Sequence, residues 1–112
     1  MNAVKDKLIA LVGEELEAAN AIYPPFSSMH EGYAVMLEEV EEVENELEVL
    51  KNGLKNLWSF TKWDDVALGC ESAEGAERRA VNLAAEAIQV AAMARKFQAI
   101  GKGMSAPGME VE

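Results

Sequence analysis

The sequence predicts an all-α protein, built as an antiparallel bundle of long helices that assembles into a homo-oligomer. Half of the residues are hydrophobic while only 6% are aromatic, and the abundant Ala, Leu and Glu are strong helix formers. Apolar residues recur at steps of three and four along most of the chain, as on one face of a helix. The last helical stretch is apolar on nearly every side, which indicates that it is enclosed by more than this chain.

The composition also indicates which classes of partner the protein is unsuited to bind. The formal net charge of −10 argues against a nucleic-acid backbone or an anionic membrane as the main partner. A phosphate ligand remains compatible with that charge if a divalent metal lies between carboxylates and phosphate. Cys70 is the only cysteine, so no internal disulfide framework is expected. The apolar run Leu8–Val12 is too short to cross a bilayer, and we expect a cytoplasmic protein.

The first predicted helix covers Asn2–Ile22, where apolar residues line one side and charged residues the other. Pro24 and Pro25 end it, because proline lacks an N–H donor and disfavours helix in the residue before it.

A second helix is predicted to begin after Ser27 or Ser28, since Glu31 completes a capping-box pattern with Ser28. Its apolar residues step by three and four alternately, which is a heptad seam, and they are Met29, Tyr33, Met36, Val40, Val43, Leu47, Leu50, Leu54 and Leu57. The seam keeps its phase through Gly53, which favours one helix to about Phe60. A short break at Asn52-Gly53 is the alternative.

The next segment, Lys62–Gly75, is expected to be a loop because Asp and Gly residues interrupt the periodicity. A third helix is predicted from near Ala73 to about Ile100, where two glycines follow. We therefore expect one helical-bundle domain over residues 1–101 and a disordered tail over residues 102–112.

The stretch Val81–Ala94 is rich in alanine and apolar around almost its whole circumference. A chain this short can hardly enclose such a helix by itself, so we expect a homodimer or homotetramer with this helix near the subunit contact. A monomeric bundle with an alanine-rich core is the alternative.

Three polar residues, Asn82, Glu86 and Gln89, form one stripe on this apolar helix. Carboxylates are seldom buried unless they are paired or bound to metal. Glu86 is therefore a candidate metal ligand. The alternatives are an ion pair with a lysine or arginine on a neighbouring helix and simple exposure at a groove.

A glutamate-rich stretch of the second helix supplies the complement. Glu39 lies beside the heptad seam, Glu42 follows one turn later, and Glu38 with Glu42 forms a like-charged pair four residues apart. By itself this stretch is typical of a charged helix face that is exposed to solvent. Opposite Glu86, however, it would form an oxygen-rich site suited to Mg²⁺ or Mn²⁺.

Other chemistry has little support in the sequence. His30 is the only histidine and does not follow a Glu at the spacing of a di-iron bundle. Zinc sites lack the necessary His and Cys ligands. Catalytic triads, glycine-rich phosphate loops and dinucleotide fingerprints are all absent.

Three segments together resemble the MazG-like proteins of bacteria and their phages, which belong to the all-α nucleoside triphosphate pyrophosphohydrolases. These segments are Phe26–Ala34, Leu37–Glu46 and Ala85–Ala94, and the resemblance covers roughly Phe26–Phe97. It implies a Mg²⁺-dependent enzyme that cleaves a nucleoside or deoxynucleoside triphosphate to the monophosphate and pyrophosphate and keeps nucleotide pools in order.

The resemblance also assigns residues. Glu38, Glu39 and Glu42 match the family's Glu-Glu-x-x-Glu motif, and Glu86 matches the start of its Glu-x-x-Asp motif. It implies that Glu39, Glu42 and Glu86 are catalytic and that all four glutamates, with Gln89, bind the metal. Gln89 stands where the family has aspartate, and the stretch between Glu42 and Glu86 is longer than usual. The alternative is a non-catalytic helical oligomerisation or regulatory protein, a degenerate relative of phage or bacterial origin.

Overall fold

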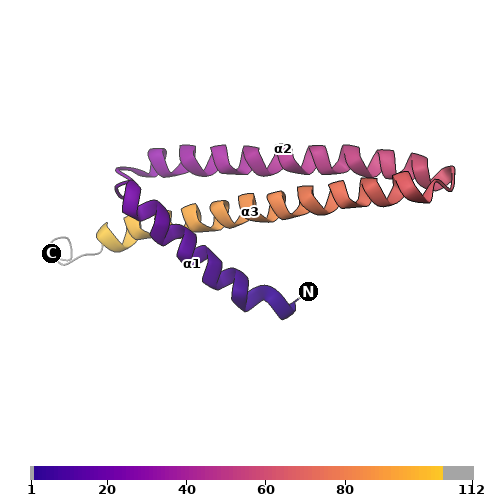
Figure 1. Cartoon of the computed structure of the whole chain (residues 1–112). Helices are drawn as coiled ribbons and strands as arrows, with labels where there is room; N and C mark the ends of the chain where they lie inside the picture. Colours follow the sequence, from indigo (N-terminus) through magenta and orange to yellow (C-terminus); the bar gives the residue numbers. More distant parts are fainter. Residues whose placement is uncertain (1, 105–112) are drawn as a thin grey trace. The chain divides into compact units, whose positions relative to one another are not determined.

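The computed structural model describes residues 2–104 of the chain. A short 3-10 helix (Asn2–Val4) leads into three α-helices, α1 (Lys5–Ile22), α2 (Met29–Lys62) and α3 (Val66–Met104), as Figure 1 shows. No strand occurs between residues 2 and 104, so the prediction of an all-α protein is confirmed. None of the helices described is long and apolar enough to cross a membrane.

The start of α2 is fixed by the predicted capping interactions. The Glu31 N–H donates to Ser28 Oγ at 3.1 Å, which satisfies one of the backbone donors that a helix leaves free at its beginning. The Glu31 carboxylate turns back and accepts from the Ser27 N–H at 2.6 Å and from the Ser27 hydroxyl at 3.0 Å. Both serines therefore take part in the cap.

Helix α2 continues without a break through Gly53, as the phase of the heptad seam predicts. A glycine inside a helix costs about 1 kcal/mol relative to alanine. Apolar residues on both sides of Gly53 keep the same helical phase. An Asn-Gly pair favours a turn only through its local conformation, and here the longer seam outweighs that preference.

The predicted loop Lys62–Gly75 is wrong. Only Trp63–Asp65 separate α2 from α3, and Asp64 takes a left-handed conformation with φ of 53°. Asp65 then caps α3, since its Oδ1 accepts from the Leu68 N–H at 3.1 Å. Once this turn is formed, helix begins at once, and Gly69 and Gly75 are accommodated inside it.

Helix α3 also runs further than predicted, to Met104 rather than to about Ile100. The glycines at 101 and 103 lie within its last turn. The predicted disordered tail, residues 102–112, lies outside the described residues from position 105 onward.

Contacts between the described residues group the chain into two compact units: unit 1 contains residues 2–40 and 87–104, and unit 2 contains residues 41–86. In unit 1, Val12 of α1 packs with Ala92 and Met93 of α3. Partly buried neighbours complete this core, and they are Leu16, Ala19, Phe26, Val35, Met36 and Ile88. Burial of these side chains supplies the main driving force for packing α1 against the two long helices within this unit.

The close approach of the helices in unit 1 depends on Gly32. A Cβ at this buried position would lie 2.5 Å from Cδ2 of Phe97 and 3.1 Å from Cδ2 of Phe26. Only a residue without a side chain fits there, so Gly32 allows two aromatic rings to reach the α2 backbone.

Unit 2 is a hairpin of the second part of α2 and the first part of α3, which lie side by side (Figure 1). Leu57 Cδ1 lies 3.9 Å from the Cβ position of Gly69, and the Ser72 hydroxyl donates to the Gly53 carbonyl oxygen at 3.4 Å. The seam residues Val43, Leu50 and Leu57 are half-buried. This half of the seam therefore lies toward the other arm of the hairpin.

Candidate metal centre

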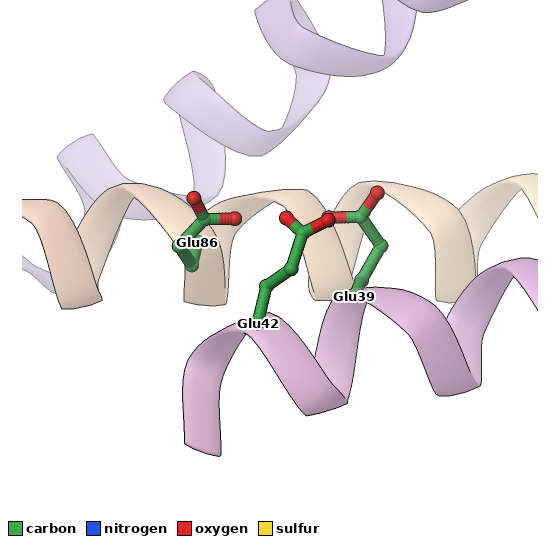
Figure 2. Close-up of side chains that lie close together, drawn as sticks. All are labelled: Glu39, Glu42 and Glu86. Carbon is green, nitrogen blue, oxygen red and sulfur yellow. The ribbon is translucent and has the colours of Figure 1, made fainter. Parts of the chain in front are cut away.

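Three of the predicted site residues come together. Glu39 and Glu42 extend from α2 and Glu86 extends from α3, and one carboxylate oxygen of each lies within 4.8 Å of the others, as Figure 2 shows. Glu42 and Glu86 both belong to unit 2, and Glu39 lies one turn before Glu42 on the same helix. Glu39 and Glu86 are half-buried, while Glu42 is exposed.

The local sequence explains this arrangement. Residues three apart on a helix share one side, so Glu39 and Glu42 extend from neighbouring turns of α2 in a common direction. The turn at Trp63–Asp65 sends α3 back along α2, which brings Glu86 level with them. Sequence spacing predicted the pair on α2, and the hairpin supplies the third carboxylate.

The donor set suits a hard divalent cation. Mg²⁺ binds oxygen ligands at about 2.0–2.1 Å in octahedral geometry, so two ligands on one ion lie about 3–4.2 Å apart. Separations within 4.8 Å come within this range after small rotations of flexible glutamate side chains. Carboxylates this close repel one another, and a bound cation would offset that repulsion.

Glu38, a further predicted metal ligand, lies outside this group, and Gln89 has a partner on α1. Glu38 is exposed and lines a cavity of unit 1 instead. Gln89 is half-buried, and its Nε2 donates to Oε2 of Glu15 on α1 at 2.5 Å. That hydrogen bond engages the amide nitrogen of Gln89 and does not involve its carbonyl oxygen.

Glu46 is a further carboxylate that the sequence analysis did not select. It lies seven residues after Glu39, which places both on one side of α2, and its Oε1 is buried without a hydrogen-bond partner. Buried carboxylate oxygens normally have a partner, but Glu46 is not one of the carboxylates that come within 4.8 Å of one another. The spacing of seven residues between Glu39 and Glu46 can be read from the sequence.

A cavity of about 410 Å³ lies in unit 1. The rings of Tyr23 and Phe26 line it together with the polar groups of Glu39, Gln89 and Lys96. Lys96 is only 6% exposed, and its Nζ lies 4.8 Å from the centroid of the Phe26 ring, within the range of a cation–π interaction. The cavity thus combines aromatic walls with a buried positive charge.

The basic residues Arg78, Arg79, Arg95 and Lys96 all lie on α3, and of these four Lys96 alone is buried in a cavity. Arg78, Arg79 and Arg95 are exposed. The sequence could not separate these four, because burial of Lys96 depends on α1 and the start of α2 packing over α3.

The Glu31 carboxyl, which also lines this cavity, has its pKa lowered from the ordinary value of 4.5. The backbone N–H of Ser27 is the main cause, followed by the Ser27 hydroxyl, and the positive charge of Lys96 adds to the effect while desolvation opposes it. Glu31 is therefore held as an anion at the start of α2.

Comparison of the chain with known protein families, with curated proteins and with solved structures finds no match in any of the three.

Proposed function

We propose that the protein is a Mg²⁺-dependent nucleotide pyrophosphohydrolase, which cleaves a nucleoside or deoxynucleoside triphosphate to the monophosphate and pyrophosphate. The observation that supports this most directly is the approach of Glu39, Glu42 and Glu86 to within 4.8 Å. These are the glutamates that the resemblance to MazG-like proteins assigns to catalysis. Mn²⁺ would fit the same oxygen ligands.

In this proposal the three carboxylates hold the cation and orient the substrate. A bound cation would neutralise phosphate charge and make a nearby water easier to deprotonate. The water oxygen forms a bond to the α-phosphorus while the bond from that phosphorus to the bridging oxygen breaks. One of the glutamates accepts the proton from the water, and pyrophosphate leaves with the bridging oxygen.

The cavity of unit 1 is the proposed place for the rest of the substrate. Its aromatic residues Tyr23 and Phe26 would contact the base or sugar. Lys96 would pair with a phosphate oxygen, because a buried ammonium group gains more from an anionic ligand than an exposed one. Glu39 belongs both to this cavity and to the acidic group. Such a substrate would place the protein in the cytoplasm.

Product analysis tests the reaction. The wild-type protein is incubated with pooled nucleoside and deoxynucleoside triphosphates in Mg²⁺ or Mn²⁺, beside Glu86→Gln and a control, Glu41→Gln, which removes an exposed charge outside the acidic group. We expect monophosphate and pyrophosphate from the wild type and from the control, and a loss of at least about a hundredfold from Glu86→Gln. No turnover by folded wild-type protein with either metal would contradict the proposal.

One observation favours a second candidate function, that of a non-catalytic helical oligomerisation or regulatory protein. Five of the nine seam residues of α2 are exposed, and four of these repeat every seven residues, namely Tyr33, Val40, Leu47 and Leu54 at 65%, 38%, 42% and 51%. Exposed apolar rows of this length are typical of surfaces that bind another helix. A homodimer or homotetramer is proposed under either function, and the product analysis separates the two.

A further inference from the structure

The two halves of the heptad seam on α2 have different surroundings. Met36, Val43, Leu50 and Leu57 repeat every seven residues and are all half-buried, whereas Met29, one repeat earlier at the start of the helix, is 61% exposed. The other row, Tyr33, Val40, Leu47 and Leu54, has the same repeat and is exposed throughout. The chain therefore uses one row of the seam for its own packing and leaves the second row without a partner among the described residues.

A third row extends the exposed surface. Leu37, Glu44, Lys51 and Trp58 also repeat every seven residues, and they lie about 40° around the helix from the exposed row. Leu37 is 42% and Trp58 is 60% exposed, and Glu44 and Lys51 are exposed between them. The two rows together form a stripe about 38 Å long from Tyr33 to Trp58, which we call the α2 stripe.

The order of side chains in the third row is self-complementary when it is reversed. From Leu37 to Trp58 the side chains of this row are apolar, negative, positive and apolar in turn, and the midpoint of the row lies beside Leu47. An antiparallel copy centred between Leu47 and Glu48 would therefore bring Glu44 opposite Lys51 of the second copy, and Leu37 opposite Trp58. A parallel copy in register would bring Glu44 opposite Glu44 and Lys51 opposite Lys51, which is repulsive.

The wider charge distribution of α2 agrees with the antiparallel orientation. From Glu31 to Glu48 every Asp, Glu, Lys or Arg on the helix is a glutamate, and from Lys51 to Lys62 every one is a lysine. Antiparallel pairing would place the acidic part of each helix against the basic part of the other. A two-fold axis requires this kind of pattern, because each contact occurs twice with the roles exchanged.

We infer that the α2 stripe binds the α2 stripe of a second copy of this chain, in antiparallel orientation about a two-fold axis near Leu47. This inference places the contact of the proposed homo-oligomer on α2 instead of near Val81–Ala94, where the sequence predicts it, and it does not depend on the hydrolytic activity. A surface of this size is at the small end for specific interfaces. We therefore expect reversible association that shows between roughly 1 µM and 1 mM protein.

Matched substitutions test the surface. Leu47 and Val49 are both 42% exposed, but Val49 lies about 200° around the helix from Leu47 and outside the stripe. Sedimentation velocity over a concentration series should show that Leu47→Asp weakens association at least about a hundredfold, because a carboxylate at the axis meets its own copy. Val49→Asp should associate as the wild type does, and circular dichroism should show that both variants remain helical.

Charge reversal tests the orientation. In the antiparallel pair, Glu44→Lys alone or Lys51→Glu alone converts two favourable contacts per dimer into repulsive ones, so association should weaken roughly tenfold. The double variant Glu44→Lys with Lys51→Glu should restore it. A parallel pair would not respond in this way, since each single reversal would leave like charges opposite each other.

The outcomes separate this inference from the proposals above. Equal behaviour of Leu47→Asp and Val49→Asp would overturn the surface while leaving a homo-oligomer possible through another face. Failure of the double reversal to restore association would overturn the antiparallel orientation. A wild-type protein that stays monomeric up to 1 mM would overturn the inference together with the proposed homo-oligomer. None of these results bears on turnover, which product analysis measures separately.

Discussion

At the scale of single residues, the hydrogen bond between Gln89 and Glu15 joins α3 to α1 in unit 1. It spans 74 positions of the sequence and lies in a partly buried setting, where a bond to a charged acceptor contributes more than one at the surface. Gln89→Ala and Glu15→Ala should each lower the free energy of unfolding by about 1–2 kcal/mol. The measurement is urea denaturation followed by circular dichroism.

The double variant provides the control for that prediction. Because both substitutions remove the same bond, their effects should fall short of additivity by about 1 kcal/mol. Strict additivity would mean that the two side chains do not interact in solution.

Some residues of the candidate site could be predicted from the sequence, and others could not because their surroundings depend on contacts between distant helices. Glu39 and Glu42 could be paired from their spacing on one helix, and Glu86 could be singled out because a carboxylate interrupts an apolar surface. Glu15 and Lys96 could not be identified, since their surroundings depend on contacts between α1 and α3 that no local pattern encodes. The hydrogen-bond partner of Gln89 could not be predicted for the same reason, because Glu15 lies on a distant helix.

At the scale of elements, two glycines of α2 should respond to alanine in opposite directions. Gly32→Ala would force a Cβ against Phe97, so it should lower the free energy of unfolding by about 1–3 kcal/mol. Gly53 has no atom within 4 Å of its Cβ position, so Gly53→Ala should raise it by about 0.5–1 kcal/mol. Thermal or urea unfolding measures both changes.

The Gly53 result also tests the continuity of α2. If residues 52 and 53 formed a turn, alanine at position 53 would destabilise the protein instead of stabilising it.

The start of α2 should give the protein a pH-dependent contribution to stability. The pKa of Glu31 is lowered from 4.5 by the Ser27 hydrogen bonds, so the folded state binds a proton there less readily than the unfolded state does. This contribution is complete above the ordinary pKa and is lost as the pH falls through the folded value. Glu31→Gln should therefore destabilise the protein at neutral pH, and the difference from wild type should shrink as pH falls from about 5 toward 3.

Urea denaturation at several pH values checks this prediction, with Ser27→Ala as a second variant that removes the hydroxyl donor and keeps the backbone donor. A difference between Glu31→Gln and wild type that stays constant down to pH 3 would contradict it.

The helices themselves were largely predictable, while the connection between α2 and α3 was not. Periodicity and capping identified α1 and α2 to within a few residues, because these signals act locally. The segment Lys62–Gly75 contains Asp and Gly residues that favour loops on average. In the structure Asp64 and Asp65 complete a tight turn and a helix cap, and packing of Leu57 near Gly69 favours helix beyond it.

At the scale of the whole molecule, a bound cation should stabilise the folded chain, since its ligands come from both α2 and α3. For a millimolar dissociation constant, about 10 mM Mg²⁺ would add roughly 1.4 kcal/mol to the free energy of unfolding. For a chain of this size the Tm should then rise by several degrees. Glu42→Gln should show a smaller rise and Glu41→Gln a rise like that of the wild type, whereas equal rises in all three would indicate non-specific binding.

Titration with Mn²⁺ followed by electron paramagnetic resonance measures whether Glu39, Glu42 and Glu86 bind a divalent cation. The signal of free Mn²⁺ decreases when the ion binds, so the wild-type protein and Glu41→Gln should both reduce it with saturation near one ion per chain. Glu42→Gln and Glu86→Gln should each need at least about tenfold more protein for the same decrease. Equal titration curves for Glu41→Gln, Glu42→Gln and Glu86→Gln would show that the three glutamates are not a metal site.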